Sequence, residues 1–345
     1  MSGERQEQLS RIVIKGYKSI KECDIDLNNI NVLIGSNGAG KSNFVSVFSL
    51  LQAMLDGELD AYGAKKGAST LFHNSPKVTE CVSLHVFDGG GRNSVYEFTM
   101  SENNTLVRSM ASHHGPLGSL EKDMYRQSQR QWRVYHFHDT SPMAKIKQEN
   151  YISNGELLQK DASNLSAFLF RLKEHYAKEY ADILETLQLI APYFKDFVLK
   201  PQGANKEQIF LRWQQKGCDD TFFASQLSDG TLRFICLAAL LLQPAELQPA
   251  TIIIDEPELG LHPFAITIFA ELVKKTAVNK QIILSTQSVE LLNHFEVDDV
   301  IVVDRDESGS QLKRLDSARL EEWLEDDYTL GDLWNKNIFG GRFAK

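Results

Sequence analysis

Apolar and polar residues alternate with different periods along the chain, and these periods predict where strands and helices lie. Residues 78–112 have a period of two between turn-forming Gly, Asp and Asn residues, which predicts an antiparallel meander. Residues 162–192 keep a helical period up to Pro192, which predicts one long helix. The last third reads as strand 251–255, helix 263–277, strand 281–285, helix 288–293 and strand 299–304. Alternating strands and helices indicate a mostly parallel sheet.

The N-terminal pattern leads into a glycine-rich loop. Residues 11–17 read as a strand, and residues 24–34 read as two strands joined by a turn at Asn28 and Asn29. The loop follows directly, and residues 42–55 then form a predicted helix with one apolar face. Further patterns predict strands over 132–137, 194–200 and 207–213 and helices over 229–242 and 317–325.

The glycine-rich loop matches the pattern G-x-x-x-x-G-K-S between a strand and a helix, the context that this pattern requires. Its residues are Gly35, Ser36, Asn37, Gly38, Ala39, Gly40, Lys41 and Ser42. Glycines let backbone N–H groups converge on phosphate oxygens, and the following helix N-terminus adds positive potential. Lys41 can place a charge at the β- and γ-phosphates, and the Ser42 hydroxyl suits Mg²⁺, which prefers oxygen ligands. We therefore predict a nucleotide phosphate site in this loop.

Two further segments carry candidate chemistry. The apolar strand 251–255 ends in Asp255 and Glu256, which we expect at the carboxyl edge of the sheet, where open α/β sheets bind ligands. Asp255 can hold Mg²⁺ through a water molecule, and Glu256 can orient or deprotonate an attacking water. The second segment, Ser-Gln-Leu-Ser-Asp-Gly-Thr-Leu-Arg over 225–233, begins a helix. It is either a second anion site or a simple capped helix start.

Charge composition narrows the class of protein. Among 345 residues, 37 Lys and Arg stand against 46 Asp and Glu, for a formal charge of −9. This balance argues against a surface that is basic throughout and binds nucleic acid non-specifically, although a local basic track stays open. Arg126, Arg130 and Arg133, beside Trp132 and Tyr135, are either such a track, with rings that stack on bases, or a solvated basic face.

The chain shows no sign of a membrane segment. Its longest apolar run, 234–242, has nine residues, whereas a span needs about 20. The polar N-terminus lacks the apolar stretch of a signal peptide, and the four cysteines form no C-x-x-C pair. We therefore expect a cytoplasmic protein.

Four motifs in order, GSNGAGKSN, LSDGT, IIIDEPELGLHP and ILSTQS, resemble those of ABC-type ATPases. The chain is similar to the RecF/SMC/OLD-like branch, because Asn43 follows GKS and the stretch IVIKGYKSIKECDIDLNNINVLIGSNG fits that branch. The stretch WRVYHFHDTS and the ending LGDLW…FGG look like a subgroup of compact, stand-alone AAA-family ATPases. The resemblance implies an α/β P-loop NTPase with an antiparallel β-subdomain and a helical insertion. Its parts would be an N-terminal ATPase lobe over 1–140, the insertion over 141–193 and a C-terminal ATPase lobe over 194–345.

The resemblance also implies roles for the motif residues. Residues 35–43, which include Asn43, would bind ATP, with Lys41 serving catalysis and Ser42 and Asp255 holding Mg²⁺. Glu256 would be the general base. The switch position, often His in relatives, is Gln287 here. Gln can donate a hydrogen bond but cannot change charge near neutral pH, so we expect slow hydrolysis.

The segment LSDGT stands where the family has its signature turn. Ser228, Asp229 and Gly230 would contact the γ-phosphate of an ATP held by the other protomer, so that two ATPs are enclosed in a head-to-tail dimer. Many relatives have Gly where Asp229 stands, and a carboxylate repels phosphate unless it points away or caps the helix. Residues 258–262 would cross between the two sites. The candidate for the family's Q-loop position is His138 or Asp139.

The sequence contains less information about the process that the ATPase drives. The chain has no nuclease motif of its own, and relatives of this type often work with a separate effector. The leading expectation is therefore ATP-dependent dimerisation, to a homodimer or higher homo-oligomer, in phage defence or DNA maintenance with a partner nuclease. The alternatives are a RecF-like repair or recombination mediator without a nuclease and a slow-hydrolysing scaffold. A transporter subunit is disfavoured. The tail, 328–345, either docks on the core or serves a partner as a handle.

Overall fold

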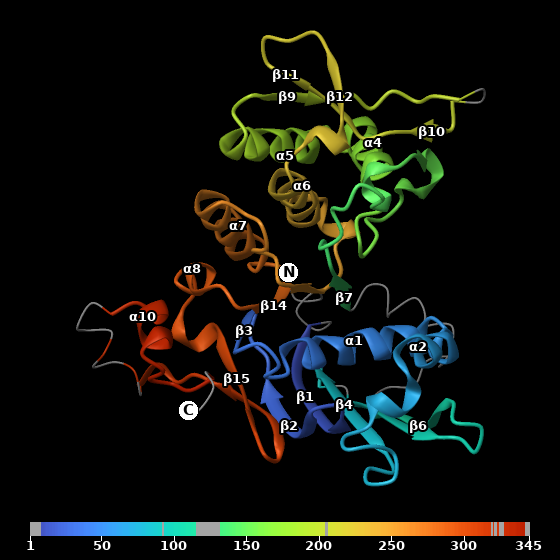
Figure 1. The fold of residues 1–345 in the computed structure, drawn as a ribbon, viewed down its shortest axis with the longest axis vertical. Helices are drawn as coiled ribbons and strands as arrows, with labels where there is room; N and C mark the ends of the chain where they lie inside the picture. Colours follow the sequence, from blue (N-terminus) through green and yellow to red (C-terminus); the bar gives the residue numbers. More distant parts are fainter. Residues whose placement is uncertain are drawn as a thin grey trace. The chain divides into compact units, whose positions relative to one another are not determined.

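The computed structural model describes residues 8–91, 93–114, 132–203, 206–318, 320, 323 and 328–341, with only the backbone of 109–114. The chain divides into two compact units (Figure 1). The first contains residues up to Val134 together with Pro249–Glu256 and the chain from Ala277 onward. The second contains Tyr135–Gln248 and Pro257–Thr276. The chain passes between the units four times, so each unit combines distant segments. The three parts expected over 1–140, 141–193 and 194–345 stay a prediction about domain organisation.

The first unit contains a five-stranded antiparallel sheet with the order β2-β1-β4-β5-β6. Its strands are β1 (Leu9–Tyr17), β2 (Ile20–Asp26), β4 (Val82–Asp88), β5 (Asn93–Met100) and β6 (Leu106–His114). Strands β4 to β6 form the antiparallel meander that the period of two predicts. The alternating burial of β1 and β4 turns one face of the sheet toward the core.

A six-stranded sheet, with the order β16-β15-β3-β14-β13-β7, carries the alternating strands of the last third. Its members are β3 (Ile30–Ile34), β7 (Trp132–Tyr135), β13 (Thr251–Asp255), β14 (Gln281–Thr286), β15 (Val300–Asp306) and β16 (Gly309–Arg314). Strands β13, β14, β3 and β15 pair in parallel, as predicted, and β16 adds an antiparallel edge that the sequence pattern did not predict.

Helix α1 (Lys41–Leu55) contributes one apolar face to the core that the two sheets share. Phe44, Phe48 and Leu51 on that face are fully buried, in a cluster with side chains from both sheets. The Phe48 ring also makes an edge contact with Trp132, with centroids 6.4 Å apart. Truncation of such a buried ring to alanine costs about 3–5 kcal/mol, so this packing fixes the helix that follows the glycine-rich loop. The unit also contains α2 (Leu59–Lys66), α8 (Val289–Leu292) and α10 (Leu330–Asn335).

The second unit is built on four helices and short strands. They are α4 (Leu165–His175), α5 (Ala177–Ile190), α6 (Asp229–Leu242), α7 (Pro263–Thr276), β8 (Asn150–Tyr151), β9 (Phe194–Phe197), β10 (Gln208–Ile209), β11 (Arg212–Gln215) and β12 (Thr221–Phe223). Strands β12, β11 and β9 form one small antiparallel sheet. The strands predicted over 194–200 and 207–213 are therefore shorter and more divided than expected.

The prediction of a single helix over 162–192 is wrong, because Tyr176 breaks it with φ −138° and ψ 58°. Helix α4 packs on the turn Ile152–Gly155, whereas α5 packs on α6. Each helix keeps an apolar face toward its own partner, so the helical period continues across a break that it cannot reveal. The helix expected over 317–325 falls largely outside the described residues. Within the described part of the chain, no helix has the length and apolarity needed to cross a membrane.

Candidate functional site

The register of the parallel strands brings three motif segments to one edge of the six-stranded sheet. Asp255 at the end of β13 pairs with Ser285 of β14, and Thr286 at the end of β14 pairs with Ile34 of β3. The glycine-rich loop begins one residue after β3. The structure therefore brings together the glycine-rich loop, the pair Asp255–Glu256 and Gln287, as expected for the carboxyl ends of neighbouring parallel strands.

The glycine-rich loop folds over the first turn of α1. The Lys41 side chain is 5 % exposed, and its Nζ donates to the carbonyl oxygens of Gly35 at 2.7 Å and Ser36 at 3.1 Å. A Cβ on Gly35 would lie 2.3 Å from the carbonyl oxygen of Val303 in β15, so only glycine fits there. The loop is thereby pressed against the sheet, with Asn37, Gly38 and Ser42 exposed.

Two serines distant in sequence support the loop from behind. Ser310 Oγ donates to the Ala39 carbonyl oxygen at 2.5 Å and lies 2.7 Å from Ser19 Oγ. Asn43 Nδ2 donates to the same Ser19 Oγ at 2.6 Å. Ser19 lies in the tight turn between β1 and β2, and Ser310 is the second residue of β16. Neither serine could be predicted from the sequence, because no local pattern marks residues that meet across 291 positions.

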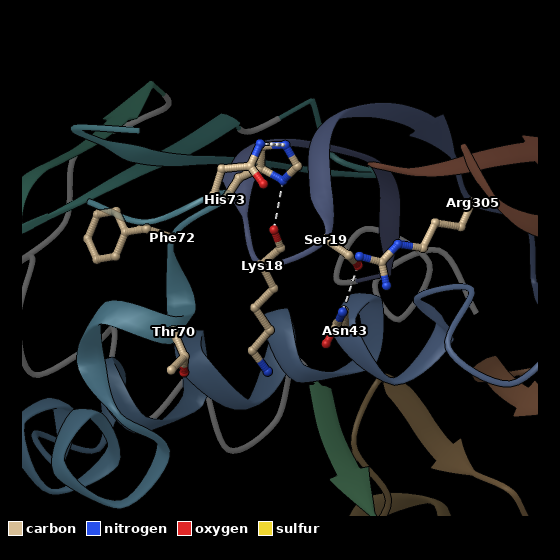
Figure 2. Close-up of a pocket in the computed structure, with 8 residues that line it drawn as sticks. Lys18, Ser19, Asn43, Thr70, Phe72, His73 and Arg305 are labelled. Atoms are coloured by element: carbon tan, nitrogen blue, oxygen red, sulfur yellow. Dashed lines mark hydrogen bonds between the residues drawn. The ribbon is translucent and has the colours of Figure 1, made fainter. Parts of the chain in front are cut away.

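A cavity of about 380 Å³ opens beside Asn43 (Figure 2). Its lining is polar and carries positive charge, and it consists of Lys18, Ser19, Asn43, Thr70, Phe72, His73, Asn74 and Arg305. Figure 2 shows the Arg305 guanidinium near Ser19 and Asn43 and the Lys18 amino group directed toward α1. Burial lowers the pKa of Lys18 to about 8, and its Nζ donates to Ser46 Oγ at 2.8 Å. None of the described residues that line this cavity is a carboxylate, so it suits an anionic or polar ligand portion next to the loop.

The carboxylate pair lies at the end of β13. Asp255 is 8 % exposed, and the next residue, Glu256, has a φ of +46°, which turns the chain sharply out of the strand. The backbone N–H of Glu256 donates to the Ser285 carbonyl oxygen at 2.7 Å. Its side-chain Oε1 accepts a hydrogen bond from Gln287 Nε2 at 2.5 Å. The candidate general base is thus held at the sheet edge by the residue at the candidate switch position.

The oxygen donors at this edge fit Mg²⁺. Ser42 offers a hydroxyl and Asp255 a carboxylate, and the Oγ of Ser285, fully buried beside Asp255, lacks a hydrogen-bond partner in the described structure. A buried hydroxyl of this kind is expected to bond to water or an ion-bound ligand. Mg²⁺ prefers hard oxygen ligands and keeps several waters, so a site with few protein ligands suits it.

The predicted signature turn lies in the second unit, at the start of α6. Ser228 is the N-cap of this helix, and its Oγ accepts from the Thr231 N–H at 3.1 Å. A Cβ on Gly230 would lie 2.3 Å from the carbonyl oxygen of Gly260, so the turn packs directly on the 258–262 loop. The Asp229 carboxylate lies 3.7 Å from Lys147 Nζ. This ion pair offsets the negative charge that the sequence places in the turn.

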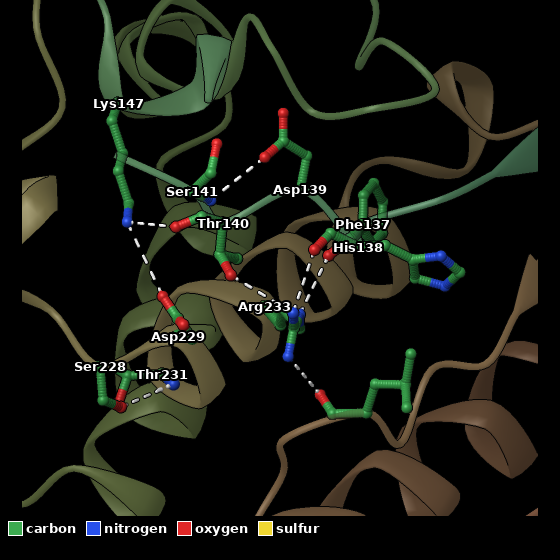
Figure 3. A network of polar contacts seen from close by, with 11 residues as sticks. Phe137, His138, Asp139, Thr140, Ser141, Lys147, Ser228, Asp229, Thr231 and Arg233 are labelled. Carbon is green, nitrogen blue, oxygen red and sulfur yellow. Dashed lines mark hydrogen bonds and ion pairs between the residues drawn. The ribbon is translucent and has the colours of Figure 1, made fainter. Parts of the chain in front are cut away.

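Arg233 ties three segments of the second unit together (Figure 3). Its guanidinium donates to the carbonyl oxygens of Phe137 at 3.3 Å, His138 at 3.0 Å and Leu259 at 3.0 Å, and to Thr140 Oγ1 at 3.3 Å. The planar guanidinium suits several acceptors at once. The segment that carries the candidate Q-loop residues is therefore hydrogen-bonded to α6 and to the 258–262 loop. The assignment of His138 or Asp139 to the Q-loop stays a prediction.

The base-stacking interpretation of the basic segment is wrong for its two aromatic residues. Trp132 is 2 % exposed and Tyr135 is 1 % exposed, so neither ring is available to stack on a base. Strand β7 turns both side chains into the protein interior, where other side chains surround them. Arg126 and Arg130 lie outside the described residues.

The fold and the sheet-edge site define an ABC-type P-loop ATPase. The chain belongs to the family described as "AAA domain, putative AbiEii toxin, Type IV TA system", whose profile matches residues 30–293. It is also 48 % identical over 44 residues to the DNA replication and repair protein RecF of Vibrio campbellii, a match that covers 12 % of each protein. The match therefore covers only a small part of that relative's length.

Solved structures share the fold at low sequence identity. The SmcHead bound to the C-winged helix domain of ScpA has a TM-score of 0.65 and 14 % identity, covering 91 % of this chain and 99 % of the other. An Smc head domain of Pyrococcus furiosus with an extended coiled coil, bound to the C-terminal domain of ScpA, gives 0.63 and 15 %, covering 93 % and 99 %. The comparisons support the RecF/SMC-like branch of the ABC-type P-loop ATPases and confirm the fold class expected from the sequence.

Proposed function

We propose that the chain binds ATP with Mg²⁺ at the sheet edge of its first unit and hydrolyses it. The observation that carries this proposal is the convergence of the glycine-rich loop, the Asp255–Glu256 pair and Gln287 on one edge. Residues 35–43 would receive the phosphates, with exposed N–H groups at the start of α1 and the charge of Lys41. The polar cavity beside Asn43 would take the remaining part of the nucleotide.

The proposed hydrolysis uses groups that this chain supplies. Ser42 and Asp255 would hold Mg²⁺, which would neutralise negative charge on the phosphates. Glu256 would accept a proton from the attacking water. Its carboxylate would act from the position in which the hydrogen bond from Gln287 holds it. A γ-phosphate would compete for the Gln287 amide, and that competition would free Glu256. Because Gln287 stays neutral, turnover would be slow.

The proposed dimer would complete each nucleotide site. Ser228, Asp229 and Gly230 lie in the second unit, where the N-terminus of the 14-residue helix α6 presents N–H groups suited to an anion. We propose that this turn contacts the γ-phosphate held by a second copy. The partner's triphosphate would then bridge the two chains, and hydrolysis would release them. Such a nucleotide-gated dimer is a switch with two states.

We propose that the switch serves a DNA-related process, phage defence or DNA maintenance, in the cytoplasm and with a separate effector nuclease. Two likenesses support this: one relative is a DNA replication and repair protein, and an Smc head is seen bound to a domain of another protein, ScpA. A slow-hydrolysing scaffold is the second candidate, favoured by the Gln287–Glu256 hydrogen bond. ATPase rates with and without DNA separate them, because only a DNA-linked ATPase is expected to respond.

The decisive test of the proposed switch is Glu256→Gln. This change keeps the side-chain shape but removes the base, so ATP should be bound and retained. The molar mass, measured by light scattering with Mg²⁺ and ATP, should double for this variant and return to the monomer after ATP removal. Adding Lys41→Ala to Glu256→Gln should abolish the mass change. A variant that stays monomeric at saturating ATP would contradict the proposal.

A further inference from the structure

The C-terminal segment 329–341 makes a backbone hydrogen bond to the glycine-rich loop. The backbone N–H of Ser36, the second residue of the loop, donates to the Gly341 carbonyl oxygen at 3.0 Å. The segment lies beyond residues 30–293, where the family profile matches.

The segment begins with a firmly capped helix. The Thr329 hydroxyl accepts from the Asp332 N–H at 3.1 Å, and the Asp332 carboxylate accepts from the Thr329 N–H at 3.0 Å, which is a capping box. The helix ends at Asn335 with Lys336 as its C-cap, and the N–H groups of Asn337 and Ile338 donate to the carbonyl oxygens of Trp334 and Leu333. Both ends of α10 are therefore closed by their own residues.

Helix α10 is seated on α8, the helix that follows the candidate switch residue. The Gly331 N–H donates to Asn293 Oδ1 at 2.6 Å, and a Cβ on Gly331 would lie 2.5 Å from the Val289 side chain. Leu330 and Leu333 are buried. Helix α8 starts immediately after its N-cap Ser288, and Gln287 precedes that cap. The position of α10 is thus fixed by the helix attached to Gln287.

The segment then turns back to the glycine-rich loop at Gly341. This residue has a φ of +86°, and a Cβ there would lie 2.6 Å from the Trp334 ring and 2.8 Å from Val302. Only glycine permits both this conformation and this approach. Gly341 also donates from its N–H to the Asp304 carboxylate at 3.4 Å. Lys41 donates a hydrogen bond to the Ser36 carbonyl oxygen, and the Gly341 carbonyl oxygen accepts one from the Ser36 N–H. Hydrogen bonds therefore hold the backbone of Ser36 on both sides.

We propose that residues 329–341 form a strut that couples the switch residue to the glycine-rich loop. One end rests on α8 through Asn293 and Gly331, and the other holds Ser36 through Gly341. Asn293 and Gly341 are positioning residues: they act on nucleotide through α8 and through the loop. The inference rests on the proposed ATP site, and it adds a route by which movement of Gln287 reaches the phosphate-binding backbone. A continuous chain of packed side chains and hydrogen bonds of this kind can carry coupling between two parts of one site.

Two neighbouring glycines allow a matched test in the full-length chain. Gly341→Ala and Gly340→Ala strain the backbone alike, because the φ of Gly340 is +79°. Among the described residues, however, the nearest atom to a Cβ on Gly340 is an Asp304 carboxylate oxygen at 3.7 Å. Binding of Mg²⁺ with ATPγS, measured by calorimetry, should weaken about 10-fold in Gly341→Ala and stay within about 2-fold in Gly340→Ala. Equal losses in both variants, or none in either, would overturn the strut.

The other end of the strut is tested at Asn293. Asn293→Ala removes the acceptor for the Gly331 N–H, and Asn293→Asp keeps an acceptor oxygen at the same place. We expect kcat to fall about 5-fold in the first variant, with recovery in the second. An equal loss in both variants would contradict a positioning role for this hydrogen bond.

Hydrogen exchange separates failure of the strut from failure of the ATP site. Measured without nucleotide, the Ser36 amide should exchange at least about 10-fold faster in Gly341→Ala than in the wild type, because its acceptor is displaced. This result is independent of ATP. Unchanged exchange would overturn the strut, whereas a wild-type chain that binds no ATP would overturn the proposed function.

Discussion

Glu256 and Gln287 meet at the edge of the six-stranded sheet, where Gln287 Nε2 donates to Glu256 Oε1 at 2.5 Å. The two residues follow neighbouring parallel strands, and the backbone of Glu256 is fixed by its own bond to Ser285. The carboxylate is therefore oriented by an amide that cannot gain or lose a proton near neutral pH. In the proposed mechanism, this hydrogen bond must exchange for one to the γ-phosphate before hydrolysis.

The change Gln287→Ala removes the amide donor. We expect kcat to fall about 10- to 100-fold while the Kd for ATP changes less than about 3-fold, because the interaction is made with the base and the departing phosphate. Steady-state kinetics and calorimetry measure the two quantities. An equal loss in kcat and affinity would instead assign Gln287 to ground-state binding.

The change Gln287→His makes the switch position titratable. Imidazole has an ordinary pKa of about 6.5, so kcat should acquire a dependence on pH near that value that the wild type lacks. The pH profiles of the two proteins between pH 5.5 and 8.5 test this. Profiles of the same shape would show that residue 287 does not contact the reacting phosphate.

The buried Lys41 is expected to be required for nucleotide binding. Lys41→Ala should weaken binding of Mg²⁺ with ATP by at least about 100-fold, because a charge at the β- and γ-phosphates is lost. Lys15→Ala is a matched control, since Lys15 lies in β1 on the exposed side of the same unit, paired with Glu22. Comparable losses in both variants would point to net charge and not to the loop.

The sequence predicted the parts of the site that are local in the chain. The glycine-rich loop and the Asp255–Glu256 pair each follow an apolar strand directly, so pattern and spacing placed them correctly at the sheet edge. The supporting contacts could not be predicted in the same way. Ser19 meets Ser310, and Ser36 meets Gly341, only because the strands and the tail fold together. The break at Tyr176 was missed because two helices with separate partners share one apolar period.

Lys18, which lines the cavity beside Asn43, should make the stability of the protein depend on pH. Burial lowers the folded-state pKa of Lys18 from 10.5 to about 8. Between these values the unfolded chain binds the extra proton, so the free energy of unfolding rises with pH across about pH 8 to 10. Replacing Lys18 by Met should flatten that rise in denaturation experiments. If the free energy of unfolding of the wild type depended on pH as little as that of the variant, the burial of the Lys18 amine would be contradicted.

Binding of ATP near Lys18 should also raise its pKa again, because a nearby anion favours the charged amine. Calorimetry at pH 8 in buffers of different ionisation enthalpy should therefore detect proton uptake on binding. Lys18→Met should reduce that uptake. Identical proton uptake in both proteins would place the nucleotide elsewhere.

Arg233 is expected to matter for the dimer more than for nucleotide binding. Arg233→Lys keeps the charge but loses the planar group that reaches the Phe137, His138 and Leu259 carbonyl oxygens. The signature turn should lose its fixed position, so dimerisation of the Glu256→Gln background should weaken about 10-fold, as measured by ultracentrifugation. Lys274→Ala, an exposed change on α7, is the control. Weakened ATP binding by the monomer would contradict this division of roles.

The central claim is that one chain's glycine-rich loop and another chain's Ser228 turn enclose the same nucleotide. Mixing two inactive variants, Lys41→Ala and Ser228→Arg, tests it most directly. In a head-to-tail heterodimer one site carries both defects and the other carries neither, so the mixture should recover up to about half of the wild-type ATPase rate per heterodimer. ATPase activity that stays at the level of the separate variants, under conditions where the wild type dimerises, would contradict the shared site.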